Sequence, residues 1–147
     1  MTFPQRYVPK GLTRKDRTAQ MKMLQKSKKL YLQHRYYTRS KLSSFKNKKS
    51  NHVSDARRIY HLKKMTPNQE LARKTGCTLS SLKQIVKKGE GAYYSSGSRP
   101  NQTPQSWGLA RLASAITSGK AAAVDYAILE KGCNHQKRAF LLAKKSK

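Results

Sequence analysis

Apolar residues recur at helical spacing along most of the chain, whereas the alternation typical of a β-strand is nearly absent. In residues 104–118, four apolar side chains fall at positions i, i+3, i+4 and i+7 and therefore share one helix face: Leu109, Leu112, Ala113 and Ile116. The pattern predicts an all-α protein. We expect a small multi-helix bundle in the C-terminal part, including a helix-turn-helix-like hairpin, and an extended basic arm and helix in the N-terminal part.

Helix start and stop signals divide the C-terminal half into short helices. Two Thr-Pro pairs, Thr66-Pro67 and Thr103-Pro104, combine an N-cap residue with proline at the first helical position. Glycines mark the expected helix ends. The predicted helices cover 67–75, 78–88, 104–118, 120–131 and 136–145, with a long loop over 89–102. We expect the last helices to bury Val124 and Ile128 and to pack against Trp107.

The N-terminal half has fewer apolar anchors. Residues 1–12 contain two prolines and a glycine and are expected to form an extended arm. Thr13 is a suitable N-cap, and Asp16 follows three residues later as in a capping box, so we predict a helix over 14–32 with a narrow apolar stripe. Further along we predict an irregular segment over 33–52 and a short helix over 55–62, capped by Ser54. These patterns divide the chain into a basic part, 1–65, and a compact helical domain, 66–147.

The charge points to a polyanionic partner. The chain has 33 Lys and Arg against six Asp and Glu, a net charge of +27 over 147 residues. Residues 1–65 alone carry +17. Such charge repels itself and opposes compaction unless an anionic partner neutralises it. The candidates are nucleic acid, an acidic protein surface and an anionic membrane, and nucleic acid leads because duplex phosphates are the densest, with one charge per roughly 1.7 Å.

Residues 70–87 resemble a helix-turn-helix. Ala72 supplies the small residue that a close crossing needs, Gly76 supplies the turn, and two apolar residues of the second helix, Leu82 and Ile85, would lock it in place. The exposed face of that helix would present Ser80, Ser81, Lys83, Gln84 and Lys87. A plain helical hairpin with a glycine turn uses the same residue pattern, so both readings stay open.

The polar segment 93–100 is a second candidate binding element. Tyr93 and Tyr94 could stack on bases, and backbone N–H groups around Gly97, together with the Arg99 guanidinium, could bind a phosphate or carboxylate. The alternative is a surface loop that the tyrosines pin to the core. The spacing is not that of a P-loop, because no Gly-Lys-Ser/Thr follows.

Nothing in the sequence indicates an enzyme, a cofactor or a metal site. No nucleophile–base pair is visible, and the histidines do not fall at metal-ligand spacing with Cys77 or Cys133. The two cysteines form no CxxC pair, so we expect free thiols in a reducing compartment, with a disulfide as the alternative. We expect no secretory signal, because the first residues lack an apolar region, and no transmembrane segment, because no run of 18 apolar residues exists.

Two stretches, 7–17 and 89–114, resemble an uncharacterised family of small basic proteins. The family is encoded by large DNA viruses of eukaryotes, the phycodnaviruses and their giant relatives, with looser relatives in phages. The resemblance runs over nearly the whole chain and carries no catalytic residues. It implies a viral product packaged in the particle, either a minor capsid protein beneath the shell or a protein that coats the genome.

Charge and resemblance together predict a non-enzymatic virion structural protein of a large double-stranded DNA virus. We expect it to be made in the host's reducing cytoplasm or nucleus, to lie in the capsid interior, and to bind acidic capsid proteins or the packaged double-stranded DNA rather than a small-molecule substrate. The alternative is a DNA-binding protein that uses a helix-turn-helix at 67–88. The candidate binding residues are Lys10, Arg14, Lys15, Arg17, Lys28, Lys29, Lys46, Lys48, Lys49, Arg57, Arg58, Lys83, Gln84, Lys87 and Arg99.

Overall fold

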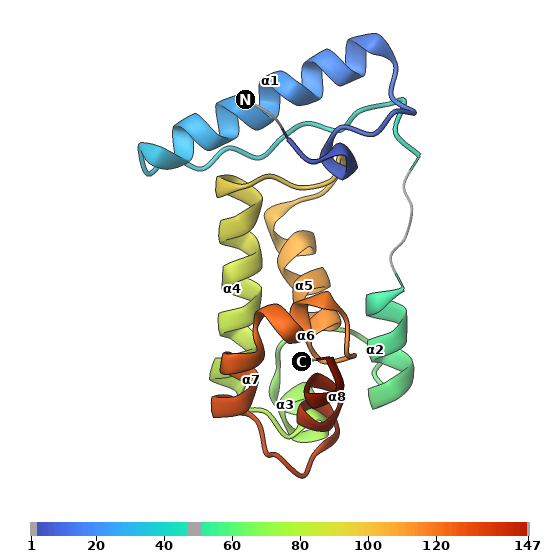
Figure 1. Ribbon diagram of the computed structural model, residues 1–147, viewed down its shortest axis with the longest axis vertical. Helices are drawn as coiled ribbons and strands as arrows, with labels where there is room; N and C mark the ends of the chain where they lie inside the picture. Colours follow the sequence, from blue (N-terminus) through green and yellow to red (C-terminus); the bar gives the residue numbers. More distant parts are fainter. Residues whose placement is uncertain (1–2, 47–50, 147) are drawn as a thin grey trace. The chain divides into compact units, whose positions relative to one another are not determined.

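A computed structural model describes residues 3–46 and 51–146, and all the regular structure in these ranges is helical (Figure 1). The all-α prediction is therefore confirmed for the described residues, where an isolated bridge between Cys77 and Cys133 is the one β-type contact. The elements are a 3₁₀ turn, η1 (Gln5–Tyr7), and the helices α1 (Arg14–Leu32), α2 (His52–Tyr60), α3 (Gln69–Thr75), α4 (Leu79–Ser95), α5 (Pro104–Ala115), α6 (Lys120–Val124), α7 (Tyr126–Gly132) and α8 (Arg138–Ser146).

The contacts divide the chain into two compact units. The arm unit comprises 1–49 and 90–107, and the bundle unit comprises 50–89 and 108–147. Helices α4 and α5 each contribute residues to both units. The division into a basic N-terminal part, 1–65, and a compact helical domain, 66–147, stays a prediction. The contacts group residues 90–107 with the N-terminal segment.

Helix α1 covers the predicted residues, and its start differs from a capping box in one respect. The Thr13 side chain caps the helix by accepting a hydrogen bond from the Asp16 backbone N–H at 3.1 Å. The Asp16 carboxylate does not return to the Thr13 N–H, and instead accepts from the backbone N–H and hydroxyl of Ser44. The helix start is thereby tied to the segment that follows α1.

The segments on either side of α1 pack within the arm unit (Figure 1). Tyr7, Leu12 and Leu42 are buried, and the buried amide of Gln20 donates to the Tyr7 carbonyl. Trp107 belongs to this unit, with its ring edge-on to Tyr7 at 6.2 Å. The expectation that Trp107 packs against the last helices is therefore wrong.

Arg39 joins three segments of the arm unit from a buried position. Its guanidinium donates to the Ser27 hydroxyl on α1, the Tyr93 carbonyl on α4 and the Ser98 hydroxyl. It also lies over the Tyr93 ring, 3.8 Å from the centroid. These neutral oxygens satisfy a buried cation without a carboxylate. Desolvation lowers the pKa of Arg39 from its ordinary value.

The bundle unit buries one apolar core to which each of its helices contributes. The Tyr60 hydroxyl on α2 donates to the Ile116 carbonyl at 2.6 Å, which ties α2 to the end of α5. Several predicted helix ends shift: α2 begins at His52 rather than after Ser54, α5 ends at Ala115, and α8 begins at Arg138. Helix α3 begins after Asn68, whose side chain accepts from the Leu71 N–H, so the Thr66-Pro67 start signal is wrong.

The predicted helix over 120–131 is interrupted at Asp125. Its buried carboxylate accepts two hydrogen bonds at 2.8 Å from the Arg111 guanidinium and lies 3.3 Å from the Lys88 ammonium. With Asp125 turned inward, Val124 is 69% exposed, so its predicted burial is wrong. The sequence pattern missed this because an apolar residue normally takes the inner position.

Helix α4 continues through Gly89 and Gly91 to Ser95, so the loop predicted from residue 89 begins only after that helix ends. Gly89 has a packing role instead of a terminating one. A Cβ atom at Gly89 would lie 2.6 Å from the Cα atom of Gly108 on α5. The absence of side chains at both glycines lets the two helices approach closely.

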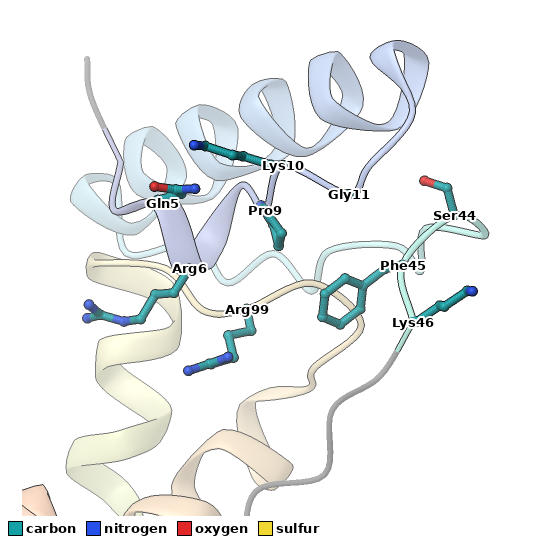
Figure 2. Close-up of a pocket in the computed structure, with 9 residues that line it drawn as sticks. All are labelled: Gln5, Arg6, Pro9, Lys10, Gly11, Ser44, Phe45, Lys46 and Arg99. Carbon is teal, nitrogen blue, oxygen red and sulfur yellow. The ribbon is translucent and has the colours of Figure 1, made fainter.

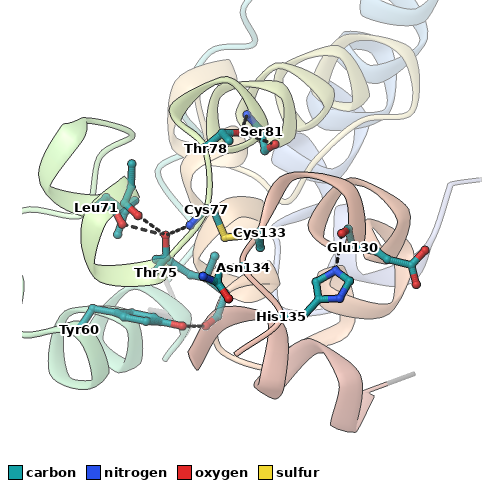
Figure 3. Close-up of a disulfide and its surroundings, with 12 residues drawn as sticks. Tyr60, Leu71, Thr75, Cys77, Thr78, Ser81, Glu130, Cys133, Asn134 and His135 are labelled. Atoms are coloured by element: carbon teal, nitrogen blue, oxygen red, sulfur yellow. Dashed lines mark hydrogen bonds between the residues drawn. A yellow bond between two sulfur atoms is a disulfide. The ribbon is translucent and has the colours of Figure 1, made fainter. Parts of the chain in front are cut away.

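The two cysteines form a disulfide, which corrects the expectation of free thiols (Figure 3). The Thr78 N–H donates to the Gly132 carbonyl and the Asn134 N–H donates to the Gly76 carbonyl. These bonds set Cys77 and Cys133 opposite one another as a non-hydrogen-bonded antiparallel pair, the arrangement that brings side chains closest. The pairing joins residues 56 apart in sequence, which is why no local signal revealed it.

Candidate functional site

The arm unit contains a cationic pocket with a volume of about 650 Å³ (Figure 2). Its lining comes from the arm, the segment after α1 and the segment after α4: Gln5, Arg6, Pro9, Lys10, Gly11, Ser44, Phe45, Lys46 and Arg99. Three predicted binding residues, Lys10, Lys46 and Arg99, are brought together here from distant parts of the sequence. The described lining residues include four cations and no carboxylate.

The backbone around the pocket is held by hydrogen bonds, while the cationic groups are exposed. The Lys10 carbonyl accepts from the Arg17 guanidinium at 3.1 Å, and the Arg99 carbonyl accepts from the Ser98 hydroxyl at 2.8 Å. The Arg6 guanidinium lies 4.8 Å from the ring centroid of the buried Tyr7. The pocket therefore presents fixed positions from which long cationic side chains reach solvent.

Ser44 connects the pocket wall to the start of α1. Its hydroxyl and backbone N–H both donate to the Asp16 carboxylate, and these bonds lower the pKa of Asp16 from its ordinary value. The carboxylate is engaged by Ser44 and is not among the lining residues of the pocket.

The groups that line the pocket are of the kinds that suit an anion. Phe45 and Lys46 leave the backbone in opposite directions, so that a half-buried aromatic ring and an exposed ammonium stand at one edge (Figure 2). Guanidinium and ammonium groups around an open hollow suit phosphate or carboxylate groups. Within residues 3–46 and 51–146, no cluster of three or more His, Cys, Asp or Glu side chains could hold a metal ion.

A second set of predicted residues lies together on α4, in the bundle unit. Ser80, Lys83, Gln84 and Lys87 are exposed and follow the i, i+3, i+4, i+7 spacing of one helix face. With Leu79 they line a shallow hollow of about 530 Å³. This stripe is the face that a recognition helix would present to DNA.

The corner between α3 and α4 matches the predicted helix-turn-helix-like hairpin. Gly76 takes the left-handed conformation, with φ +78°, and Leu82 and Ile85 are fully buried. Ser81 is a correction, because it is buried: its hydroxyl lies 2.7 Å from that of Thr78, and the residue packs against Gly132.

The segment after α4 does not form the phosphate cradle considered from the sequence. The backbone N–H groups of Ser96 and Gly97 both donate to the Ala92 carbonyl, closing the helix. Tyr93 is fully buried, and its hydroxyl accepts from the Arg39 N–H, so this tyrosine pins the segment as the alternative reading proposed. Tyr94 is half-buried and Arg99 exposed, so these two keep accessible groups.

The other predicted cations do not line either hollow. Arg14, Lys15 and Arg17 lie in the first turn of α1, and Lys28 and Lys29 lie near its end. Arg57 and Arg58 are exposed on α2, where Arg58 lies 3.5 Å from the Asp55 carboxylate. Lys48 and Lys49 lie outside the described residues.

Sequence analysis missed Arg6, Phe45 and Arg39. Nothing in the local pattern distinguishes Arg6 or Arg39 from the other cations of the chain, and Phe45 is an isolated aromatic in a polar segment. Their roles depend on contacts between distant segments, so no local signal could have found them.

The few carboxylates are largely engaged inside the chain. Glu70 pairs with Lys74 at 3.0 Å, and Asp125 pairs with Arg111 and Lys88. A hydrogen bond from Lys74 lowers the pKa of Glu70, and a hydrogen bond to Asp125 raises the pKa of Arg111. Internal pairing thus leaves most of the positive charge uncompensated.

Among the described residues, no helix has the length and apolarity to cross a membrane.

Comparison with known proteins identifies a family but no function. No curated protein and no solved structure matches the chain. The model of a family of unknown function, DUF5824, matches residues 4–134. The chain belongs to this family.

Proposed function

We propose that this member of DUF5824 is a non-enzymatic structural protein of the minor capsid type, from a large double-stranded DNA virus, that binds the packaged genome through its phosphates. The observation that carries the proposal is the cationic pocket: Arg6, Lys10, Lys46 and Arg99 line one hollow whose described lining holds no carboxylate. Each cation that meets a phosphate releases counterions, which favours binding without reading the sequence.

The charge balance supports a polymeric anion over a small one. Six carboxylates cannot neutralise 33 Lys and Arg, and three of these carboxylates already pair within the bundle unit. A single small anion in the pocket would leave almost all of this charge unmet. Duplex DNA can meet it, because its charge is continuous along the helix.

The viral setting and the capsid location rest on the resemblance of 7–17 and 89–114 to proteins of large DNA viruses. An acidic surface of a capsid protein is the other partner of suitable charge in a particle. Guanidinium groups bind carboxylates as readily as phosphates. The same pocket could therefore bind an acidic capsid protein, and the test below distinguishes this partner from duplex DNA.

The test is a charge reversal in the pocket with a matched control. Lys10→Glu/Arg99→Glu changes the net charge by the same amount as Lys144→Glu/Lys145→Glu on α8, where both lysines are exposed. We expect the pocket variant to lose about tenfold or more in duplex affinity relative to the control, on two duplexes of unrelated sequence. Equal losses in both variants would refute the pocket as the duplex-binding site. If the wild-type protein does not bind duplex even at low salt, the pocket would instead be assigned to an acidic protein partner.

A second candidate function, sequence-specific DNA binding, is favoured by the exposed stripe on α4. Gln84 and Lys83 are residue types that bond base edges in the major groove. The variant Lys83→Ala/Gln84→Ala separates the two functions. A changed ratio of affinities between two duplex sequences would support sequence-specific binding, whereas an equal loss of affinity for both would support phosphate binding.

A further inference from the structure

A cluster of aromatic and apolar side chains, two of them exposed and two half-buried, lies in the arm unit, apart from the residues that line the cationic pocket. We define the tyrosine patch as Tyr31 and Leu32 at the end of α1, Tyr36 just beyond it, and Tyr94 on α4. The Tyr36 ring centroid lies 5.0 Å from that of Tyr94 and 6.2 Å from that of Tyr31. The three rings thus form one contiguous aromatic surface.

Two members of the patch are open to solvent, although the same unit buries other tyrosines. Tyr36 is 70% exposed and Leu32 is 83% exposed, and both are among the few large apolar residues that the described chain leaves in water. Tyr93, next to Tyr94, is fully buried with its hydroxyl bonded to Arg39. Apolar side chains that gather at one exposed place indicate a binding surface.

Cations flank the patch. Lys28 lies one turn before Leu32 on the same face of α1, with the exposed Lys29 beside it, and the exposed Arg35 directly precedes Tyr36. One carboxylate, Glu90, lies one turn before Tyr94 on α4. The surroundings therefore combine net positive charge with the exposed ring of Tyr36.

We propose that the tyrosine patch is a stacking platform for unpaired bases of single-stranded nucleic acid. Aromatic side chains beside a cationic track bind single strands with little sequence preference, because every base has a face that can stack. Bases of an intact duplex stack on one another and cannot reach Tyr36. This site goes beyond the proposed function, which concerns duplex phosphates in the pocket.

The test measures binding of a labelled 20-nucleotide oligo-dT and a 20-base-pair duplex by fluorescence anisotropy, using the full chain with its disulfide intact. We expect Tyr36→Ala to weaken oligo-dT binding about fivefold or more, with less than a twofold effect on the duplex. Tyr36→Phe keeps the ring and should stay within twofold of wild type on both. Leu141→Ala removes an exposed apolar side chain from α8 and is the control outside the patch.

Photocrosslinking gives a readout independent of substitution. A single strand containing 5-iodouracil, bound to the wild-type protein, should crosslink to the peptides that contain Tyr31, Tyr36 or Tyr94. Crosslinks confined to other peptides, no oligo-dT binding by wild type at low salt, or equal losses on single strand and duplex in Tyr36→Ala would each overturn the platform. A Tyr36→Ala defect in binding anionic vesicles, with oligo-dT binding unchanged, would overturn it in favour of a lipid surface.

The two proposals fail separately. Loss of the Tyr36 effect with pocket-dependent duplex binding retained removes only the platform. Loss of duplex binding with Tyr36-dependent binding of oligo-dT retained removes only the duplex-binding function.

Discussion

At the scale of single residues, burial of a cation is the feature that departs most from expectation. Arg39 is buried although a buried charge is costly unless well satisfied. Its planar guanidinium meets this cost by donating to Ser27, Tyr93 and Ser98, which lie on three segments. Arg39 therefore holds together the unit that carries the pocket, although one arginine among 33 cations gives no sign of this in the sequence.

Replacing Arg39 tests that role. Arg39→Lys keeps the charge but loses the fork that reaches two serines at once, so we expect roughly 1–3 kcal/mol lower stability. Arg35→Lys, at an exposed position, should stay within about 0.5 kcal/mol of wild type. Urea unfolding of the wild type and the two variants measures these differences in stability. Equal unfolding midpoints for the two variants would contradict the role of Arg39 in holding the arm unit together.

Asp16 gives a pH prediction at the same scale. Hydrogen bonds from Ser44 lower its pKa in the folded state. The resulting stability is present above the unfolded pKa of about 3.9 and is lost as the pH falls through the lower folded value. Thermal melts between pH 6 and pH 2 should show wild type losing more stability on acidification than Asp16→Asn. Parallel pH profiles would show that the Ser44 contact does not stabilise the fold.

At the scale of elements, local sequence signals predict where helices occur better than they predict the residues at which those helices begin and end. The N-cap at Thr13 and the left-handed Gly76 were identified because both depend on neighbouring residues alone. The prediction that Gly89 ends a helix is wrong, because the glycine is required by its close contact with Gly108 on another helix. The break at Asp125 likewise has no local signal, since the inward position of its carboxylate depends on Arg111.

A pair of glycines on α4 tests the close approach. Gly89→Ala would set a Cβ atom 2.6 Å from the Gly108 Cα atom, so we expect it to destabilise the protein. Gly91→Ala, two residues later in the same helix, meets nothing within 4 Å and should stabilise by roughly 0.5–1 kcal/mol through helix propensity. Melting temperatures that move in the same direction for both variants would contradict the packing role of Gly89.

The disulfide braces the turn between α3 and α4 against the end of α7. It closes a loop of 56 residues in sequence separation, so its removal should cost roughly 2–4 kcal/mol. Thermal melts of the oxidised protein, the reduced protein and Cys77→Ser/Cys133→Ser measure this. Unchanged melting temperatures would show that the bond contributes nothing, and a free-thiol count of two in protein purified without reductant would show that it does not form.

At the scale of the whole molecule, periodicity and charge were enough for the all-α class and for a polyanionic partner as a prediction. The pocket could not be predicted, because Lys10, Lys46 and Arg99 meet only once three separate segments pack together. The expected arm likewise turned out to be packed, because Tyr7, Leu12 and Leu42 bury themselves within the unit. The local pattern does not reveal this burial, because Tyr7 packs against Trp107 and the Leu42 backbone bonds to Asn101, both distant in sequence.

The central claim, phosphate-driven binding without sequence preference, is tested most directly by the salt dependence of duplex affinity. The measurement is the slope of log K against log salt concentration for the wild-type protein on two duplexes of equal length and unrelated sequence. If the four pocket cations each neutralise one phosphate, both slopes should be about −3.6 or steeper, and they should agree. Slopes near zero, or affinities that differ more than tenfold between the two duplexes, would contradict the account.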